Sequence, residues 1–217
     1  MAGPEASTKL LLTLERALGR QAGKDNALWK TGRFAAGVVP DLPPATTVEG
    51  LVRHWWASAR GQVPPPDHSA MDFGGPGLLV RSVAGQLRSG PRLQARMRAM
   101  AGTDPALTGN LGPASALLLL SGAHPLRPLL PDWALQHSTG MLQDAARLKA
   151  QGALPSGLGL WAVANPMTDR LDRIQSKAHA GARVLLTQPP LLHAPSEEWM
   201  ARAVDAGLAE ACRLPKP

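Results

Sequence analysis

The chain contains little cysteine and few aromatic residues: one Cys, two Phe and no Tyr among 217 residues. Because Cys212 has no second cysteine to pair with, the disulfide-stapled class of small proteins is excluded. Long hydrophobic runs are also absent, since the longest, residues 114–120, is interrupted by a serine and is far shorter than the roughly 20 residues of a membrane span. Residues 1–20 include two glutamates and lack the apolar core of a secretory signal. We therefore expect no membrane partner and a cytoplasmic location, with an organellar destination as the alternative.

Charge is sparse but biased toward positive. Charged residues make up 18% of the chain and hydrophobic residues 44%, which predicts a packed domain rather than a disordered chain. The net charge of +7 raises the question of nucleic acid. The densest basic group has few aromatic residues interleaved for base stacking, and no known nucleic-acid motif accompanies it; its members are Arg81, Arg88, Arg92, Arg96 and Arg98. We interpret this group as a solvated basic face and expect no nucleic-acid partner.

The first half of the chain is interrupted by many of the 22 glycines and 21 prolines and gives weak signals. A helix is expected over Lys9–Leu18 and another around Thr47–Ala59, with a short apolar run at Phe34–Val39. We divide the chain into an N-terminal extension with a helix, residues 1–30, and a single domain, residues 31–217.

The second half alternates apolar runs with amphipathic helices. The expected strands are Ala116–Ser121, Leu158–Ala164 and Arg183–Gln188, and the expected helices are Trp133–Gln151, Thr168–Ala180 and Ser196–Gly207. Nearly continuous apolar strands alternating with helices are typical of parallel βα units buried on both faces. Such units form a doubly wound sheet or a barrel. Because neither a G-x-G-x-x-G nor a G-x-x-x-x-G-K-[ST] motif is present, we favour the barrel.

Polar residues follow each of these three strands. His124, Asn165 and Gln188 would meet at one rim, because ligand sites in parallel α/β folds lie at the carboxyl ends of the strands. Asn165 before a proline is also a common turn former, and His124 has no cysteine or acidic neighbour at metal-ligand spacing, so we expect no metal. Gln188 ends an apolar strand, where a long amide needs a partner or a ligand. No nucleophile motif such as G-x-S-x-G occurs, which argues against a hydrolase.

Residues 160–166, 170–177 and 180–188 together resemble the methylenetetrahydrofolate reductases, flavin enzymes built on a TIM barrel. The shared features are an asparagine-proline pair after a strand, a lysine in the next helix, an alanine-glycine-alanine turn and a strand that closes in threonine-glutamine. Residues 117–125 look like the family's strand ending in glycine-aspartate. Residues 34–40 look like its first barrel strand, which carries a glutamate.

The resemblance implies an incomplete TIM-type (β/α) barrel of about six βα units that lacks the last two. It also implies FAD, NAD(P)H as the electron donor and a folate-type substrate. Gln188 would bind the substrate, Lys177 would approach the FAD phosphates, Gly122 would let the cofactor approach the backbone, and Ser121 and Asn165 would occupy neighbouring cofactor positions. An open barrel edge would be covered by a second copy or a partner chain.

Two acidic residues of the family pattern are replaced. Ala123 stands where the family has an aspartate, and Gly37 falls where residues 34–40 would carry the glutamate that protonates the substrate; Asp41 is the nearest acidic substitute. No catalytic residue is therefore assigned. The leading expectation is a flavin-dependent oxidoreductase, and the alternative is a catalytically silent relative that acts as a ligand-binding or interaction subunit. An unrelated α/β protein is the third reading. A rim filled by Trp133 or Trp161 would favour the silent relative.

Overall fold

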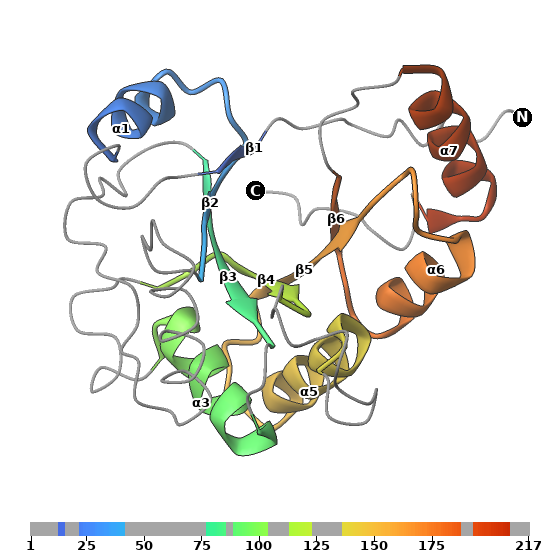
Figure 1. Cartoon of the computed structure of the whole chain (residues 1–217). Coiled ribbons are helices and arrows are strands. Elements are labelled where there is room, and N and C mark those ends of the chain that lie inside the picture. Colours follow the sequence, from blue (N-terminus) through green and yellow to red (C-terminus); the bar gives the residue numbers. More distant parts are fainter. Residues whose placement is uncertain are drawn as a thin grey trace, which may run out of the picture.

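A six-stranded, entirely parallel sheet forms the centre of the molecule. The computed structural model describes residues 13–15, 22–41, 77–85, 89–103, 113–122, 136–187 and 193–208. The strands are β1 (Thr13–Glu15), β2 (Ala36–Val39), β3 (Leu78–Ala84), β4 (Ala116–Leu120), β5 (Gly159–Ala164) and β6 (Val184–Thr187), and they lie side by side in chain order. The sheet curls into a half-barrel (Figure 1), which is consistent with part of a TIM-type barrel.

A described helix follows every strand except β2, and the helices lie around the outside of the curled sheet (Figure 1). They are α1 (Ala22–Lys30), α3 (Gly90–Ala101), α5 (Ser138–Ala150), α6 (Leu171–His179) and α7 (His193–Asp205). Pro91 stands in the first turn of α3, where its missing N–H costs nothing, and Gly102 ends the helix in the left-handed conformation at φ 77°. The expectation of an α/β fold built from parallel βα units is confirmed.

Most elements of the second half agree with the sequence-based expectation, with shifted ends. The three expected strands are β4, β5 and β6, and the helices are α5, α6 and α7. Helix α6 begins at Leu171 rather than Thr168, because residues 165–169 form a hydrogen-bonded turn after β5. Helix α5 begins at Ser138, and the expected start at residue 133 lies outside the described residues.

Three expectations for the first half need comment. The helix over Lys9–Leu18 is wrong, because Thr13–Glu15 pairs with β2 as a strand. Residues 34–40 do not form the first strand of the sheet, since β1 precedes them. The expected helix at Thr47–Ala59 lies outside the described residues.

Strand β3 and helix α3 were not expected from the sequence. Strand β3 carries Arg81 in its middle, and this charged residue interrupts the apolar run that would indicate a strand.

The convex face of the sheet packs against α3 and α5. Its main cluster joins alternate residues of β3, β4 and β5 to apolar side chains of the two helices; examples are Val83, Leu117, Leu119, Leu160, Leu93, Met97, Met141 and Leu142. A second cluster on this side joins Ala164 and Ile174 to Trp199 of α7. Burying this much apolar surface is the main stabilising contribution that a sheet of this kind receives.

The concave face is lined by the other set of alternating residues. Val80, Leu118 and Trp161 belong to one buried apolar cluster there. A Cβ atom added to Gly159 would lie 3.3 Å from Nε1 of Trp161 and 3.0 Å from Cβ of Ala116. The indole of Trp161 therefore leans toward the amino end of β5, over two small residues. Trp161 is 4% exposed and belongs to the buried concave cluster.

Candidate functional site

Three of the four residues expected at the cofactor lie at neighbouring strand ends. Ser121 and Gly122 directly follow β4, and Asn165 directly follows β5. These strands are adjacent and parallel, with Leu119 opposite Ala162, so the residues that follow them share one rim. Gly122 has a φ of 81°, a conformation that side chains disfavour and that brings bare backbone to the rim. All three are half-buried.

An apolar shelf lies beside these residues on the concave face. It consists of Leu120, Val163 and Leu186, one residue from each of β4, β5 and β6, and all three are partly exposed. Val163 is opposite Leu186 in the register of β5 and β6. The three residues pack against the buried cluster that contains Trp161. The shelf and the short polar residues next to it form a surface suited to a flat, partly polar ring system.

Asn165 also performs the turn role that was its alternative. Its side-chain Oδ1 accepts a hydrogen bond from the Met167 N–H at 3.0 Å, and its backbone oxygen accepts from the N–H groups of Thr168 at 3.2 Å and Asp169 at 2.8 Å. These bonds fix the turn between β5 and α6. They involve the oxygen of the side-chain amide, so its Nδ2 is the atom that remains for a ligand at the rim.

Lys177 lies apart from the other three residues. Its side chain is 6% exposed between β5 and α6, and its Nζ donates to the backbone oxygen of Val163 at 2.6 Å and to Asp169 Oδ2 at 3.4 Å. Burial lowers the pKa of Lys177, while the nearby Asp169 carboxylate partly opposes that shift. The ammonium group points into the protein, and the structure does not bring it to the rim residues.

Asp41, the acidic substitute suggested by the sequence, is held in a buried ion pair. Its Oδ1 receives Nε of Arg96 at 3.1 Å as well as the Nη2 group, and its Oδ2 receives the Ala84 N–H at 3.1 Å. The Asp41 N–H donates to Ser82 Oγ at 2.7 Å, and that hydroxyl donates to the Val39 oxygen at 3.1 Å. The pair joins α3 to the carboxyl ends of β2 and β3.

This burial also corrects the expectation of a solvated basic face. Arg81 and Arg96 are buried, and Arg81 donates from Nη1 to the Met100 oxygen at 3.0 Å across β3 and α3. Burial lowers the pKa of Arg81 to about 10. Arg92 is exposed and Arg98 is half-buried, while Arg88 lies outside the described residues. At least two members of the basic group therefore lie inside the fold and not on a solvated face.

Glu15 is an acidic residue at a strand end that the sequence analysis did not single out. It is the last residue of β1 and lies opposite Val38 of β2. Gly37, where an acidic residue was sought, lies inside β2 between Leu14 and Leu79. The signal was present in the sequence as an apolar run that ends in a glutamate, but a strand of three residues has too few positions to show an alternating pattern.

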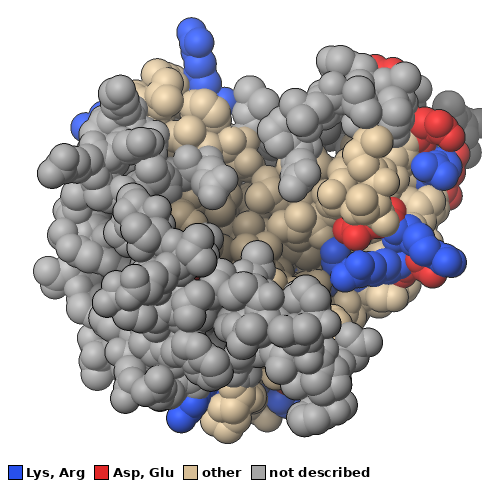
Figure 2. All heavy atoms as spheres, viewed as in Figure 1, with Lys and Arg blue, Asp and Glu red and all other residues tan. Residues whose placement is uncertain are grey.

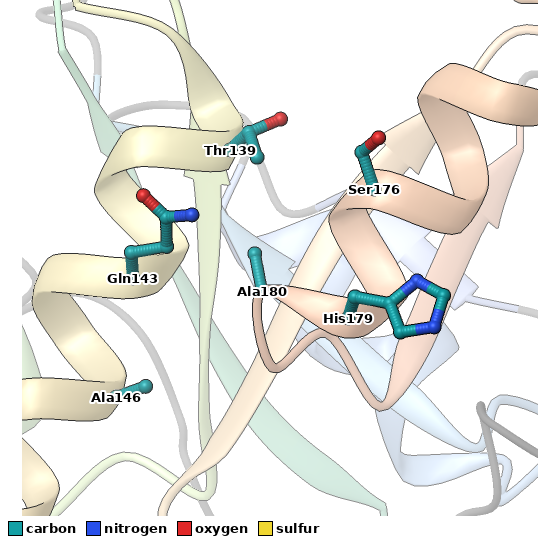
Figure 3. A pocket seen from close by; sticks show the side chains of 6 residues that line it. All are labelled: Thr139, Gln143, Ala146, Ser176, His179 and Ala180. Carbon is teal, nitrogen blue, oxygen red and sulfur yellow. The ribbon is translucent and has the colours of Figure 1, made fainter.

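A groove lies between α5 and α6 (Figure 3). Its volume is about 560 Å³, and it is lined by Thr139, Gln143, Ala146, Ser176, His179 and Ala180. None of the expected site residues lines it. In the space-filling view, acidic and basic side chains gather over α6, whereas the described surface in the middle of the half-barrel is uncharged (Figure 2).

No family model matches the chain, and no curated protein matches it. Among the residues that the structure describes, no group of three or more His, Cys, Asp or Glu is arranged to hold a metal ion. In the same part of the chain, no helix is long and apolar enough to cross a membrane. Ala123, His124, Trp133 and Gln188 lie outside the described residues.

The Asp41–Arg96 pair should contribute strongly to stability. Replacing Arg96 by Met leaves the Asp41 carboxylate buried without this cation, so we expect a loss of about 3–5 kcal/mol in the free energy of unfolding. The matched control is Arg147→Met, which removes the exposed pair with Asp144 and should cost less than about 1 kcal/mol. Urea unfolding of both variants measures the difference. Equal losses would contradict the role given to the buried pair.

The buried ammonium of Lys177 predicts an alkaline dependence of stability. Because its pKa is lowered from 10.5, the folded chain releases this proton at a lower pH than the unfolded chain. Between the pKa of the folded chain and that of the unfolded chain, the unfolded state binds more protons, so the free energy of unfolding rises with pH. Below both pKa values Lys177 is charged in both states, and the folded chain carries the full free-energy cost of burying the ammonium. We expect wild type to gain stability relative to Lys177→Met as the pH approaches 10.5. Urea titrations that show an unchanged or shrinking difference would argue against a buried charge.

Proposed function

We propose that the chain is a flavin-dependent oxidoreductase of the methylenetetrahydrofolate reductase type. The observation that carries this proposal is the convergence of Ser121, Gly122 and Asn165 at one rim, beside the apolar shelf of Leu120, Val163 and Leu186. A flavin ring has two flat apolar faces and a polar edge, and this arrangement offers an apolar surface, an exposed backbone and a side-chain amide for that edge.

The residues present fit the ring of FAD better than its phosphates. Ser121 and Asn165 would hydrogen-bond the ring edge, and Gly122 would let the ring approach the backbone. Lys177, to which the resemblance gives the phosphate contact, is instead engaged with Val163 and Asp169 inside the protein. We therefore assign the ring contacts to the rim and give Lys177 no phosphate contact.

When bound, FAD would supply a relay for hydride from NAD(P)H to a methylene-folate substrate. The protein's contribution would be orientation, the exclusion of water by the apolar shelf, and a proton donor. Glu15 is our choice for the donor, because it ends the first strand of the sheet, and the resemblance places a glutamate on the first barrel strand. Gln188 would hold the folate ring, as the resemblance implies.

The alternative is a catalytically silent relative that binds a ligand or a partner. Two acidic side chains that could have served catalysis are instead held in ion pairs inside the protein, Asp41 with Arg96 and Asp169 with Lys177, and this favours the alternative. In that case flavin would bind, but neither NADH nor NADPH would bleach it, because the groups that orient the nicotinamide and the substrate would be lost.

Flavin uptake is the first test. We expect the purified protein to be yellow, or to become so with added FAD. Asn165→Leu should weaken FAD binding by at least about tenfold, because it removes the Nδ2 donor offered to the ligand and also the Oδ1 bond to Met167 that fixes the turn. Gln143→Leu is the matched control, because it makes the same kind of change on the outer surface of α5. The measurement is fluorescence titration with FAD. A colourless protein that takes up no FAD would remove the basis of the proposal.

The role of Glu15 is tested by separating the two half-reactions. Glu15→Gln should slow the oxidation of reduced flavin by methylene-folate by roughly 10²- to 10⁴-fold, because a general acid is removed, while reduction by NAD(P)H keeps its rate. Stopped-flow absorbance at the flavin band follows both steps. A variant that reoxidises at the wild-type rate would show that the proton comes from another group.

A further inference from the structure

We propose that Lys177 and Asp169 are positioning residues that fix the turn carrying Asn165, and through it the ring-binding rim. This inference rests on the proposed function for its ligand, but its structural part stands on contacts of the described residues alone. It assigns Lys177 a role at the site that acts through Asp169 rather than on the cofactor.

Asp169 is the centre of the arrangement. Its Oδ2 accepts the backbone N–H of Asn165 at 3.1 Å and the ammonium of Lys177 at 3.4 Å, while its Oδ1 lies 3.6 Å from Nη1 of Arg173. The carboxylate is only 12% exposed. It therefore joins the first residue of the turn to α6, the helix that follows the turn.

Lys177 holds the turn from the other side. Its Nζ donates to the oxygen of Val163, which lies two residues before Asn165 on β5, and to Asp169, which lies four residues after Asn165. The described pairing of β4 with β5 ends at Ala162, so Val163 lies just beyond it. One buried ammonium thus ties the end of the strand to the end of the turn, with Asn165 between them.

This geometry differs from that of a phosphate-binding lysine. A lysine that binds a phosphate presents its ammonium to the ligand as a point charge, whereas this one is buried and donates to a strand carbonyl and a carboxylate. The cost of burying the charge is visible in the lowered pKa of Lys177. Asn165 is the expected site residue within this turn, and the contacts of Lys177 and Asp169 lie on both sides of it.

FAD, FMN and riboflavin share one ring system, and riboflavin carries no phosphate. Their affinities therefore distinguish a positioning role of Lys177 from a phosphate contact. We expect Lys177→Met to raise the dissociation constants of FAD, FMN and riboflavin by a similar factor of about ten, because the loss falls on the ring that all three share. The matched control is Lys149→Met: Lys149 also donates to a backbone oxygen, that of Leu158, but near the amino end of β5. Its affinities should not change. Weaker binding of FAD and FMN with riboflavin unchanged would overturn the proposal in favour of a phosphate contact.

A second readout does not depend on flavin. Amide hydrogen exchange of Asn165 and of residues 167–169 should accelerate in Lys177→Met and stay at the wild-type rate in Lys149→Met, because the Asn165 N–H loses a fixed acceptor. Unchanged exchange at Asn165 would overturn the positioning role. If wild type binds none of the three flavins, the proposed function fails, while the exchange result still decides this inference.

A milder variant covers the case in which Lys177→Met does not fold. Asp169→Asn removes the charge that faces Lys177 but keeps a side-chain oxygen for the Asn165 N–H. We expect the same pattern of flavin affinities and faster exchange at Asn165, with smaller changes. Wild-type values in both measurements would count against the proposal.

Discussion

The parallel pairing of the strands in chain order is the constraint on which the rest of the structure depends. Because every strand runs in the same direction, every residue that follows a strand lies at the same edge of the sheet. That single fact brings Glu15, Ser121, Gly122 and Asn165 to one rim, although they are far apart in the sequence. It also separates this rim from the opposite end of the sheet, where Trp161 leans over Gly159 and serves packing.

The sequence predicted those parts of the fold whose pattern is local. Apolar runs of five or six residues, with helices between them, sufficed for β4 and β5, and the order of elements then placed Ser121 and Asn165 at strand ends. Strand β1 was too short to show a period, and Arg81 interrupted the apolar pattern of β3. These strands form because their neighbours pair with them, which no local pattern records.

The direction in which a long charged side chain points could not be predicted from the local sequence either. Lys177 lies at the spacing that the resemblance describes, yet whether its ammonium faces solvent or the protein depends on where folding places the Val163 oxygen and the Asp169 carboxylate. Arg81 and Arg96 likewise read as surface residues, because burial of an arginine requires acceptors that come from other elements. For Arg96 the acceptor is Asp41, which is 55 residues away in the sequence. For Arg81 the acceptor is the backbone oxygen of Met100 in α3.

The ion pair between Asp41 and Arg96 has a consequence for the order of assembly. Its two residues are separated by 55 positions in the chain, so the contact closes a long loop. Closing such a loop costs chain entropy before the contact repays it, and contacts of this kind slow folding. The salt bridge at the end of β2 therefore cannot form until the part of the chain that carries Arg96 is present, which makes this anchor dependent on a helix encoded after the strand. During synthesis on the ribosome, the amino-terminal side of the half-barrel must wait for Arg96 to emerge before it reaches its final stability.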